Sequence, residues 1–160
     1  PGTHSKWVLW RDGAIIDFTT VPTGDIHAGL HRSTLISRTL PGSPVEVRGP
    51  LLEEFDRGLD LARGRGWLAS IFKVRSLPVL DGMPPDRASA LLSGILIGGE
   101  VLERAREGPL PRTLVAGTAL LRDLYLRAFS RLNVPAEGVP EEVSEIASVE
   151  GLRALRRLSR

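Results

Sequence analysis

The first twenty residues, PGTHSKWVLWRDGAIIDFTT (residues 1–20), decide how the fold begins. Two apolar runs, 7–10 and 14–20, flank the pair Asp12-Gly13, and an Asp-Gly pair in that position predicts a β-hairpin. A glycine turn beside a strand can direct backbone N–H groups, hydroxyls and an ammonium toward one anionic phosphate. The sequence therefore predicts a candidate phosphate site, formed by Gly2, Thr3, His4, Ser5 and Lys6. The alternative is that these residues form an ordinary turn with polar surface side chains.

Length and composition indicate one globular domain over residues 1–160. The chain has no cysteine, which excludes disulfides and thiolate metal sites and is compatible with the cytosol, so we expect a cytoplasmic protein. The longest apolar stretch, 88–102, is too short and too interrupted to span a bilayer, and we expect no membrane partner. The formal charge is only +2 and most arginines lie near acids, so we expect no nucleic-acid partner.

Helical patterns dominate the middle of the chain. Thr23 is a candidate N-cap for a helix that begins there, and 40–50 is rich in proline and glycine and predicts a loop. The patterns then predict a helix over 51–62 closed by Gly64, a helix over 67–75, a loop bracketed by Pro78 and Pro84-Pro85, and a long helix over 86–106.

The long helix carries small residues at four-residue spacing, Ala90, Gly94 and Gly98, which share one face. Small residues in a row let another backbone approach closely. The simplest interpretation is a tightly packed central helix, and the alternative is a surface that docks a partner.

Residues 113–116 predict a short buried strand, which leads through Gly117-Thr118 into a helix. In open α/β sheets ligands bind beyond the carboxyl ends of strands, where free N–H groups of the next helix face them. Gly117 and Thr118 are therefore candidate ligand contacts, unless the glycine serves only a tight turn. After a loop over 133–140, alternation predicts an edge strand over 143–147, and Ser148 is a candidate cap for a last helix. This order of elements implies a mixed α/β domain.

Histidines and acids identify no catalytic or metal site. His27 and His31 have helical spacing, but no glutamate stands next to His27, so the metalloprotease pattern is absent. With His4 they are interpreted as surface or capping residues, and no zinc or other bound metal is assigned to the protein. The aspartates show no spacing that identifies a catalytic carboxylate.

Several stretches resemble the C-terminal part of the 2-keto-3-deoxygalactonate kinases (2-dehydro-3-deoxygalactonokinases), sugar kinases of the actin-like ATPase superfamily. Residues 1–7 resemble their second phosphate-binding turn, and Thr23-Gly24-Asp25 resembles the Thr-Gly-Glu that opens their next helix, departing in the acid. LSGILIGGE at 92–100 resembles their central helix. VAGTAL at 115–120, with Tyr125, resembles their adenosine-side strand and helix.

The resemblance implies phosphoryl transfer from ATP, commonly with Mg²⁺, to a hydroxyl of a 2-keto-3-deoxy sugar acid. It implies phosphate binding by residues 2–6 and adenosine binding by Gly117 and Thr118. The implied fold is the C-terminal lobe of an actin-like ATPase (ribonuclease H-like) fold, a mixed sheet with helices on its faces. Motifs of the N-terminal lobe and the first strand of this lobe are absent from the sequence. We therefore expect a C-terminal fragment without a catalytic base, inactive alone.

A lobe without its first strand would expose unpaired backbone groups beside apolar side chains. We expect the chain to recruit a partner strand or the missing lobe, to self-associate, or to be marginally stable. Two alternatives to part of a kinase remain open at this point. One is a non-catalytic nucleotide-binding module, and the other is a helical interaction domain that docks a partner on the small-residue face.

Overall fold

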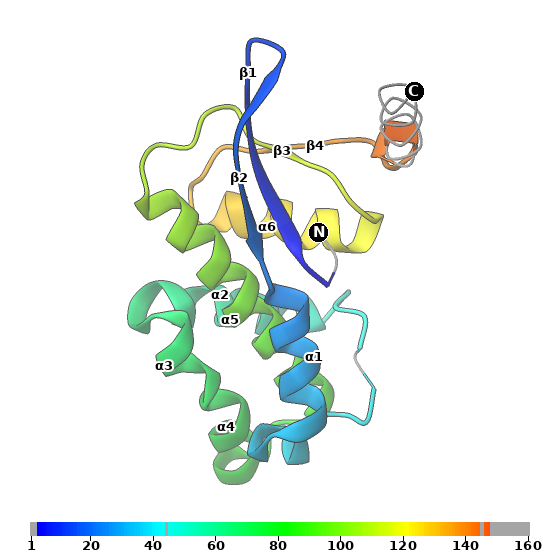
Figure 1. The fold of residues 1–160 in the computed structure, drawn as a ribbon. Coiled ribbons are helices and arrows are strands. Elements are labelled where there is room, and N and C mark those ends of the chain that lie inside the picture. Colours follow the sequence, from blue (N-terminus) through cyan, green and yellow to red (C-terminus); the bar gives the residue numbers. More distant parts are fainter. Residues whose placement is uncertain (1–2, 44, 145, 148–160) are drawn as a thin grey trace.

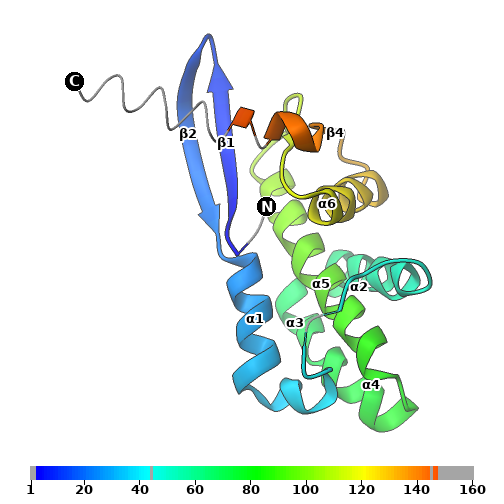
Figure 2. The same cartoon turned by 90° about the vertical axis from the view of Figure 1, so that its right-hand side faces the viewer.

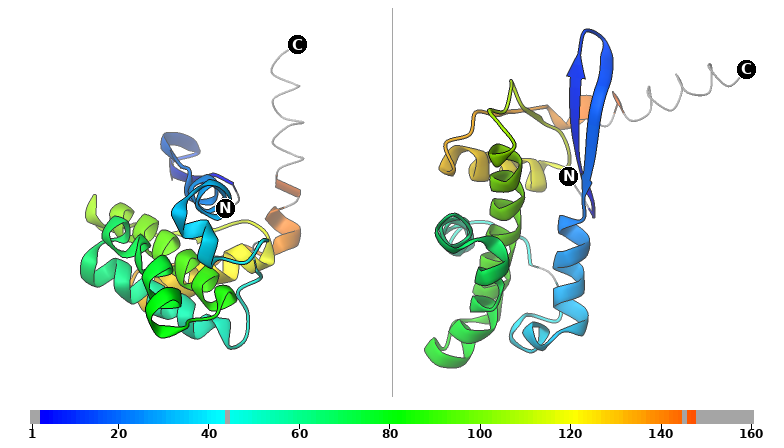
Figure 3. Two further views of the ribbon diagram at one scale, coloured as in Figure 1. Left: turned by 90° about the horizontal axis from the view of Figure 1, so that it is seen from below. Right: turned by 60° about the vertical axis from the view of Figure 1, so that its left-hand side comes forward.

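The computed structural model describes residues 3–43, 45–144 and 146–147. A β-hairpin stands beside a body of helices, and its far end projects beyond them (Figure 1). Helix α5 (Pro85–Arg106) lies between the hairpin and helix α1 (Thr23–Ser33) on one side and helices α2 (Leu51–Arg65) and α6 (Ala119–Arg131) on the other (Figures 2 and 3). Within these described ranges, no helix is both long and apolar enough to cross a membrane.

The predicted hairpin is confirmed. Strands β1 (Ser5–Arg11) and β2 (Ala14–Val21) pair antiparallel. Asp12 and Gly13 join them with φ of 51° and 82°, which a tight hairpin turn with the twist of the strands requires. Among the described residues each of these strands pairs only with the other. On one face the cross-strand pairs Val8–Phe18 and Trp10–Ile15 are exposed, so the hairpin carries an uncovered apolar face, with Trp10 66% and Phe18 67% exposed.

Helix α1 (Thr23–Ser33) follows the hairpin directly and ends in a 3-10 turn, η1 (Leu35–Thr39). The prediction that Thr23 caps this helix is wrong. Pro22 occupies the N-cap position, and no side chain caps the helix. The Thr23 hydroxyl instead donates to the Glu100 carboxylate, and a charged acceptor binds a hydroxyl donor more strongly than a neutral one does.

Helices α2 (Leu51–Arg65) and α5 (Pro85–Arg106) form the centre of the molecule. They meet at two glycines: a Cβ on Gly58 would lie 2.4 Å from the Leu91 carbonyl oxygen, and one on Gly94 would lie 2.0 Å from the Phe55 carbonyl oxygen. The prediction of a tightly packed central helix is confirmed. Because α2 covers the small-residue face, that face does not offer a docking surface.

Two boundaries near this pair differ from the predictions. Helix α2 continues through Gly64 and ends at Gly66, whose φ of 82° terminates the helix. The expected helix over 67–75 is two helices, α3 (Trp67–Ile71) and α4 (Lys73–Asp81).

Pro78 lies inside α4 and not in a loop. Its missing N–H would have bonded the Val74 carbonyl four residues earlier. The Thr39 hydroxyl lies 3.1 Å from that carbonyl and 2.9 Å from the Ile36 carbonyl, so its one proton is shared between the two acceptors. This contact from η1 partly satisfies the carbonyl that the proline leaves without its helical donor.

The last part of the described chain holds a second small sheet. Strand β3 (Leu114–Val115) pairs parallel with β4 (Glu137–Gly138), and helix α6 (Ala119–Arg131) connects them. The protein is thus α/β, but its described strands form two separate two-stranded sheets and not one mixed sheet. The core lies mainly on α5, packed against α2, α4 and α6.

The expected edge strand over 143–147 is also wrong. Residues 141–144 and 146–147 are helical. The Ser144 N–H donates to the Pro140 carbonyl at 3.1 Å, which is the spacing of an α-helical turn. The candidate cap Ser148 and the basic tail lie outside the described residues.

Candidate functional site

The predicted phosphate turn is fastened to the first turn of α1. The Asp25 N–H donates to the Thr3 carbonyl at 3.0 Å. The His4 Nε2 lies 3.1 Å from the Asp25 Oδ2 at the surface. These two contacts hold the turn against the helix N-terminus, where the free N–H groups and the helix dipole favour anions. Gly2 lies outside the described residues.

Ser5, at the end of this turn, reaches into a buried polar cluster around Glu100. The Glu100 side chain is 5% exposed, and its carboxylate accepts hydrogen bonds from four neutral groups. The Ser5 hydroxyl (3.2 Å), the Trp7 indole N–H (2.7 Å), the Tyr125 hydroxyl (2.6 Å) and the Thr23 hydroxyl donate to it. The cluster therefore joins β1, α1, α5 and α6 at one point.

Tyr125 stays protonated in this cluster. Burial, followed by the charge of Glu100, raises the pKa of the Tyr125 phenol far above its ordinary value. Its hydroxyl also lies 2.8 Å from the Ser5 hydroxyl. Both hydroxyls are thus engaged inside the protein, and the Ser5 side chain is buried.

Lys6 lies on the other face of the strand. Successive side chains of a strand point to opposite faces. Because Ser5 and Trp7 point toward α5, Lys6 points away from the Glu100 cluster. Its side chain is exposed. The structure therefore brings Thr3, His4 and Ser5 together with α1 and α5 but does not bring Lys6 to the same side.

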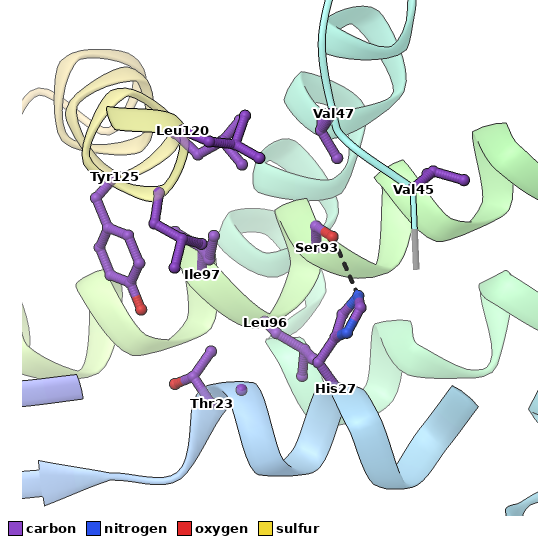
Figure 4. Close-up of a pocket in the computed structure, with 12 residues that line it drawn as sticks. Thr23, His27, Val45, Val47, Ser93, Leu96, Ile97, Leu120 and Tyr125 are labelled. Carbon is purple, nitrogen blue, oxygen red and sulfur yellow. Dashed lines mark hydrogen bonds between the residues drawn. The ribbon is translucent and has the colours of Figure 1, made fainter. Parts of the chain in front are cut away.

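A cavity of about 200 Å³ opens next to the cluster (Figure 4). It lies between the first turns of α1, the middle of α5, the start of α6 and the loop after η1. Most of its lining is apolar, and Thr23, His27, Ser93 and Tyr125 supply the polar side chains. A concave, mainly apolar cavity with a few polar groups is the usual form of a small-molecule site. The remaining lining residues are Gly24, Val45, Val47, Leu96, Ile97, Leu120, Leu121 and Leu124.

His27 is a neutral group in this lining. Burial, and the neighbouring His31 at a ring-centroid distance of 4.5 Å, lower the pKa of His27 from 6.5 to about 4. The His27 Nε2 lies 3.3 Å from the Ser93 hydroxyl, which donates its single proton to the Ser89 carbonyl at 3.1 Å. Ser93 must then accept from Nε2–H, so the Nδ1 of His27 is left as an acceptor.

The second histidine of the pair is bound to α5 in the same way. The His31 Nε2 lies 3.2 Å from the Ser89 hydroxyl, and burial lowers the pKa of His31. His4 pairs with Asp25 elsewhere, so the three histidines do not meet. Within the part of the chain that the structure describes, no group of three or more histidines and acids is placed to hold a metal.

Gly117 and Thr118 form the bend between β3 and α6. Gly117 has a φ of 153°, a conformation that favours glycine. Thr118 is the N-cap residue of α6, and the Ala119 N–H behind it donates to the Glu141 carboxylate at 3.1 Å. Helix α6 then runs past the cavity through Leu120 to Tyr125.

The bend and the turn are therefore linked through one helix. Tyr125, which bonds Ser5, follows Thr118 by about two helical turns, or about 10 Å. The cavity lies along that stretch of α6 and is also lined by Thr23 and Gly24, directly before Asp25. Neither predicted site lines the cavity itself: the turn contacts Asp25, directly after Thr23 and Gly24, and the bend directly precedes the part of α6 that begins at Leu120.

Neither Glu100 nor His27 is identifiable from the sequence as part of this site. A lone acid inside an otherwise apolar helix was the available signal for Glu100, because acids are rarely buried without partners. For His27 the spacing to His31 was visible, but nothing in the sequence indicated Ser93 as its partner. Tyr125 was indicated as part of the site only by the family resemblance.

Comparisons with known proteins point in one direction. A family model described as 2-keto-3-deoxy-galactonokinase matches residues 1–155. The 2-dehydro-3-deoxygalactonokinase of Escherichia coli (strain K12) is 35% identical over 159 residues, covering 95% of this chain and 51% of that protein. A Rhizobium meliloti (strain 1021) protein named probable 2-dehydro-3-deoxygalactonokinase DgoK1 is 32% identical over 148 residues. That match covers 89% of this chain and 48% of that protein.

A crystal structure of a candidate 2-dehydro-3-deoxygalactonokinase from Sinorhizobium meliloti has a similar fold. Its TM-score is 0.81 at 27% sequence identity, and the match covers 97% of this chain and 52% of that one. The chain spans about half the length of the curated relatives it matches.

Proposed function

The chain belongs to the 2-keto-3-deoxy-galactonokinase family, and we propose that it forms the nucleotide-binding half of a kinase that phosphorylates 2-keto-3-deoxygalactonate with ATP. The observation that carries this proposal is a cavity lined by Thr23 and Gly24, next to the contact between the Thr3 carbonyl and the Asp25 N–H, and by Leu120 and Leu121, just after the Gly117 bend. A nucleotide has an anionic end and a flat apolar end, and such a site offers a counterpart to each.

The phosphates bind at the turn formed by Gly2, Thr3, His4, Ser5 and Lys6. The contact between Thr3 and the Asp25 N–H supports this placement, because it sets the turn at the N-terminus of α1. Ser5 contributes through its backbone, since its hydroxyl is engaged with Glu100 and Tyr125. Lys6 follows the turn directly but on the opposite, exposed face of the strand, so in this proposal its long side chain bends back toward the phosphates to supply the positive charge.

A Mg²⁺ ion would accompany the nucleotide in this proposal. Mg²⁺ binds oxygen ligands and is commonly held by one or two carboxylates together with phosphates. Asp25 is an exposed carboxylate in contact with the turn, and it fits the role of such a ligand. The bound ion would neutralise charge on the phosphates. Glu100 does not fit that role, because four donors already occupy its two oxygens.

The nucleoside occupies the cavity and contacts Gly117 and Thr118. The apolar side chains Leu120 and Leu121, from the first turn of α6, support a flat ring there. In the tautomer whose Nε2–H donates to Ser93, the Nδ1 of His27 is a hydrogen-bond acceptor in this mainly apolar lining.

Phosphoryl transfer depends mainly on positioning and on neutralising charge. The chain's own contribution would be to hold the phosphates at the turn and to fix the nucleoside along α6. We assign no catalytic base to this chain. In this proposal the base and most of the sugar-acid pocket belong to a companion lobe, as expected for an actin-like ATPase fold closed around a cleft.

The uncovered hairpin supports the need for a companion. The outer edge of β1 has no strand partner among the described residues, and the apolar pairs beside it are exposed. Unpaired strand edges with apolar faces associate readily. We propose that a companion lobe covers this hairpin, and that without one the chain self-associates.

The proposal is tested by calorimetric titration of the 160-residue chain with ADP. We expect binding by the wild type and at least tenfold weaker binding by Lys6→Ala, because the variant removes a cation from the phosphate site. Lys73→Ala is the matched control, since Lys73 is the second of only two lysines and lies on α4. Adding the companion lobe should restore ATP-dependent phosphorylation of 2-keto-3-deoxygalactonate. Failure of the wild type to bind ADP would overturn the assignment, and binding without turnover in the complete enzyme would favour a non-catalytic nucleotide module.

A further inference from the structure

Glu100 is the most unusual group in the described structure that the proposed reaction does not use directly. It is a buried carboxylate with no cation among its hydrogen-bond partners, since all four donors are neutral. Burying a charge is costly unless hydrogen bonds satisfy it. Here both oxygens are satisfied, and the four donors come from three separate elements, β1, α1 and α6.

Each donor belongs to an element that builds the nucleotide site. Ser5 ends the phosphate turn, and Thr23 begins α1, on which that turn rests. Tyr125 lines the cavity from α6. Trp7 continues β1 and packs against Phe129 at a ring-centroid distance of 5.9 Å. The carboxylate is thus the common acceptor for the turn and for the walls around it.

We propose that Glu100 is a positioning residue, which fixes the phosphate turn in its binding shape before the nucleotide arrives. This inference rests on the proposed nucleotide site and adds the group that shapes it. If the turn is already ordered, binding does not have to include the entropy cost of ordering it. The phosphates therefore bind with higher affinity. The nucleoside meets this cluster only through Thr23 and Tyr125 in the cavity wall, so its affinity should depend on Glu100 much less than the affinity for the phosphates does.

Glu100→Gln separates this role from size and packing. The amide keeps the shape, but its NH₂ end donates where the carboxylate accepted, so either the Trp7 N–H loses its acceptor or the three hydroxyls must turn to accept. Trp7→Phe is a milder second variant, because it removes one donor and keeps the aromatic contact with Phe129. Glu54→Gln is the matched control: Glu54 is also a buried carboxylate, but it pairs with Arg57 and Arg87 on the helical side.

The test is a calorimetric titration of wild type and variants with ADP and with adenosine. We expect Glu100→Gln to weaken ADP binding at least tenfold, about 1.4 kcal/mol, and to leave adenosine binding within twofold. Trp7→Phe should shift ADP in the same direction by less, and it carries the test if Glu100→Gln does not fold. Glu54→Gln should change neither ligand.

Two results would overturn the inference while leaving the nucleotide site in place. One is unchanged ADP affinity in both Glu100→Gln and Trp7→Phe. The other is an equal loss for ADP and adenosine, which would mean that Glu100 supports the whole fold and not the turn. A wild type that binds neither ligand would instead overturn the proposed function, and the inference with it.

Discussion

The contact between α2 and α5 makes a quantitative prediction. A Cβ added at Gly58 would lie 2.4 Å from the Leu91 carbonyl oxygen and 2.8 Å from the Ile95 nitrogen. Both are backbone atoms, so no side-chain rotation relieves the clash, and the helices must separate by about 1 Å to reach the ordinary contact distance of 3.4 Å. Overpacking of a core costs about 1–3 kcal/mol and occasionally more. We expect Gly58→Ala to destabilise the fold by a net ~3 kcal/mol.

Gly64→Ala is the control in the same helix. Nothing lies within 4 Å of a Cβ at Gly64, so the change adds helix propensity alone and should stabilise the protein by about 1 kcal/mol. For a chain of this size 1 kcal/mol shifts Tm by about 2–4 °C. Thermal unfolding followed by circular dichroism should then show Gly58→Ala lower by about 6–12 °C and Gly64→Ala higher by about 2–4 °C. Equal melting temperatures for the two variants would refute the close approach of the helices.

Two other expectations concern pH and association. The pKa of His27 is about 4 in the folded protein, against 6.5 for an exposed histidine such as that of the unfolded chain. The unfolded chain therefore takes up the proton first as pH falls. The free energy of unfolding should therefore fall by on the order of 3 kcal/mol between pH 6.5 and 4. Urea unfolding at a series of pH values measures this. A His27→Gln variant whose unfolding free energy fell just as steeply with pH would contradict the prediction. Phe18→Lys places a charge on the exposed hairpin face and should reduce self-association in sedimentation velocity. An unchanged oligomer distribution would mean that this face is not the contact.

Elements with strong local signals were predictable from the sequence. The Asp12-Gly13 pair fixed the hairpin, because few backbone conformations join two strands in two residues. The long helix over 86–106 followed from its apolar pattern, and the spacing of Gly94 and Gly98 correctly indicated close packing. In each case the decisive interaction lies within a few residues or repeats along one face.

The misassigned residues depend on partners far away in the sequence. Thr23 has the composition of an N-cap, but Glu100, 77 residues away, takes its hydroxyl. Pro78 is a helix breaker by propensity, and the carbonyl that it leaves without a helical donor, on Val74, is contacted by the Thr39 hydroxyl 35 residues earlier in the chain. No local pattern encodes these contacts, so tertiary structure overrode the local preference. The same reason hid Glu100 as the centre of the site.

The base of the hairpin belongs to the proposed nucleotide site, and its far end carries the uncovered apolar surface. At its base Trp7 is held by Glu100, by the ring of Phe129 and by the Arg104 guanidinium 5.5 Å above it. Beyond this residue the strands still pair with each other, but apolar side chains such as Phe18 lose contact with the helices. Packing of an apolar face, more than pairing alone, stabilises a two-stranded sheet. The turn can therefore be fixed by contacts within this chain, while the far half of the same hairpin depends on whatever covers it.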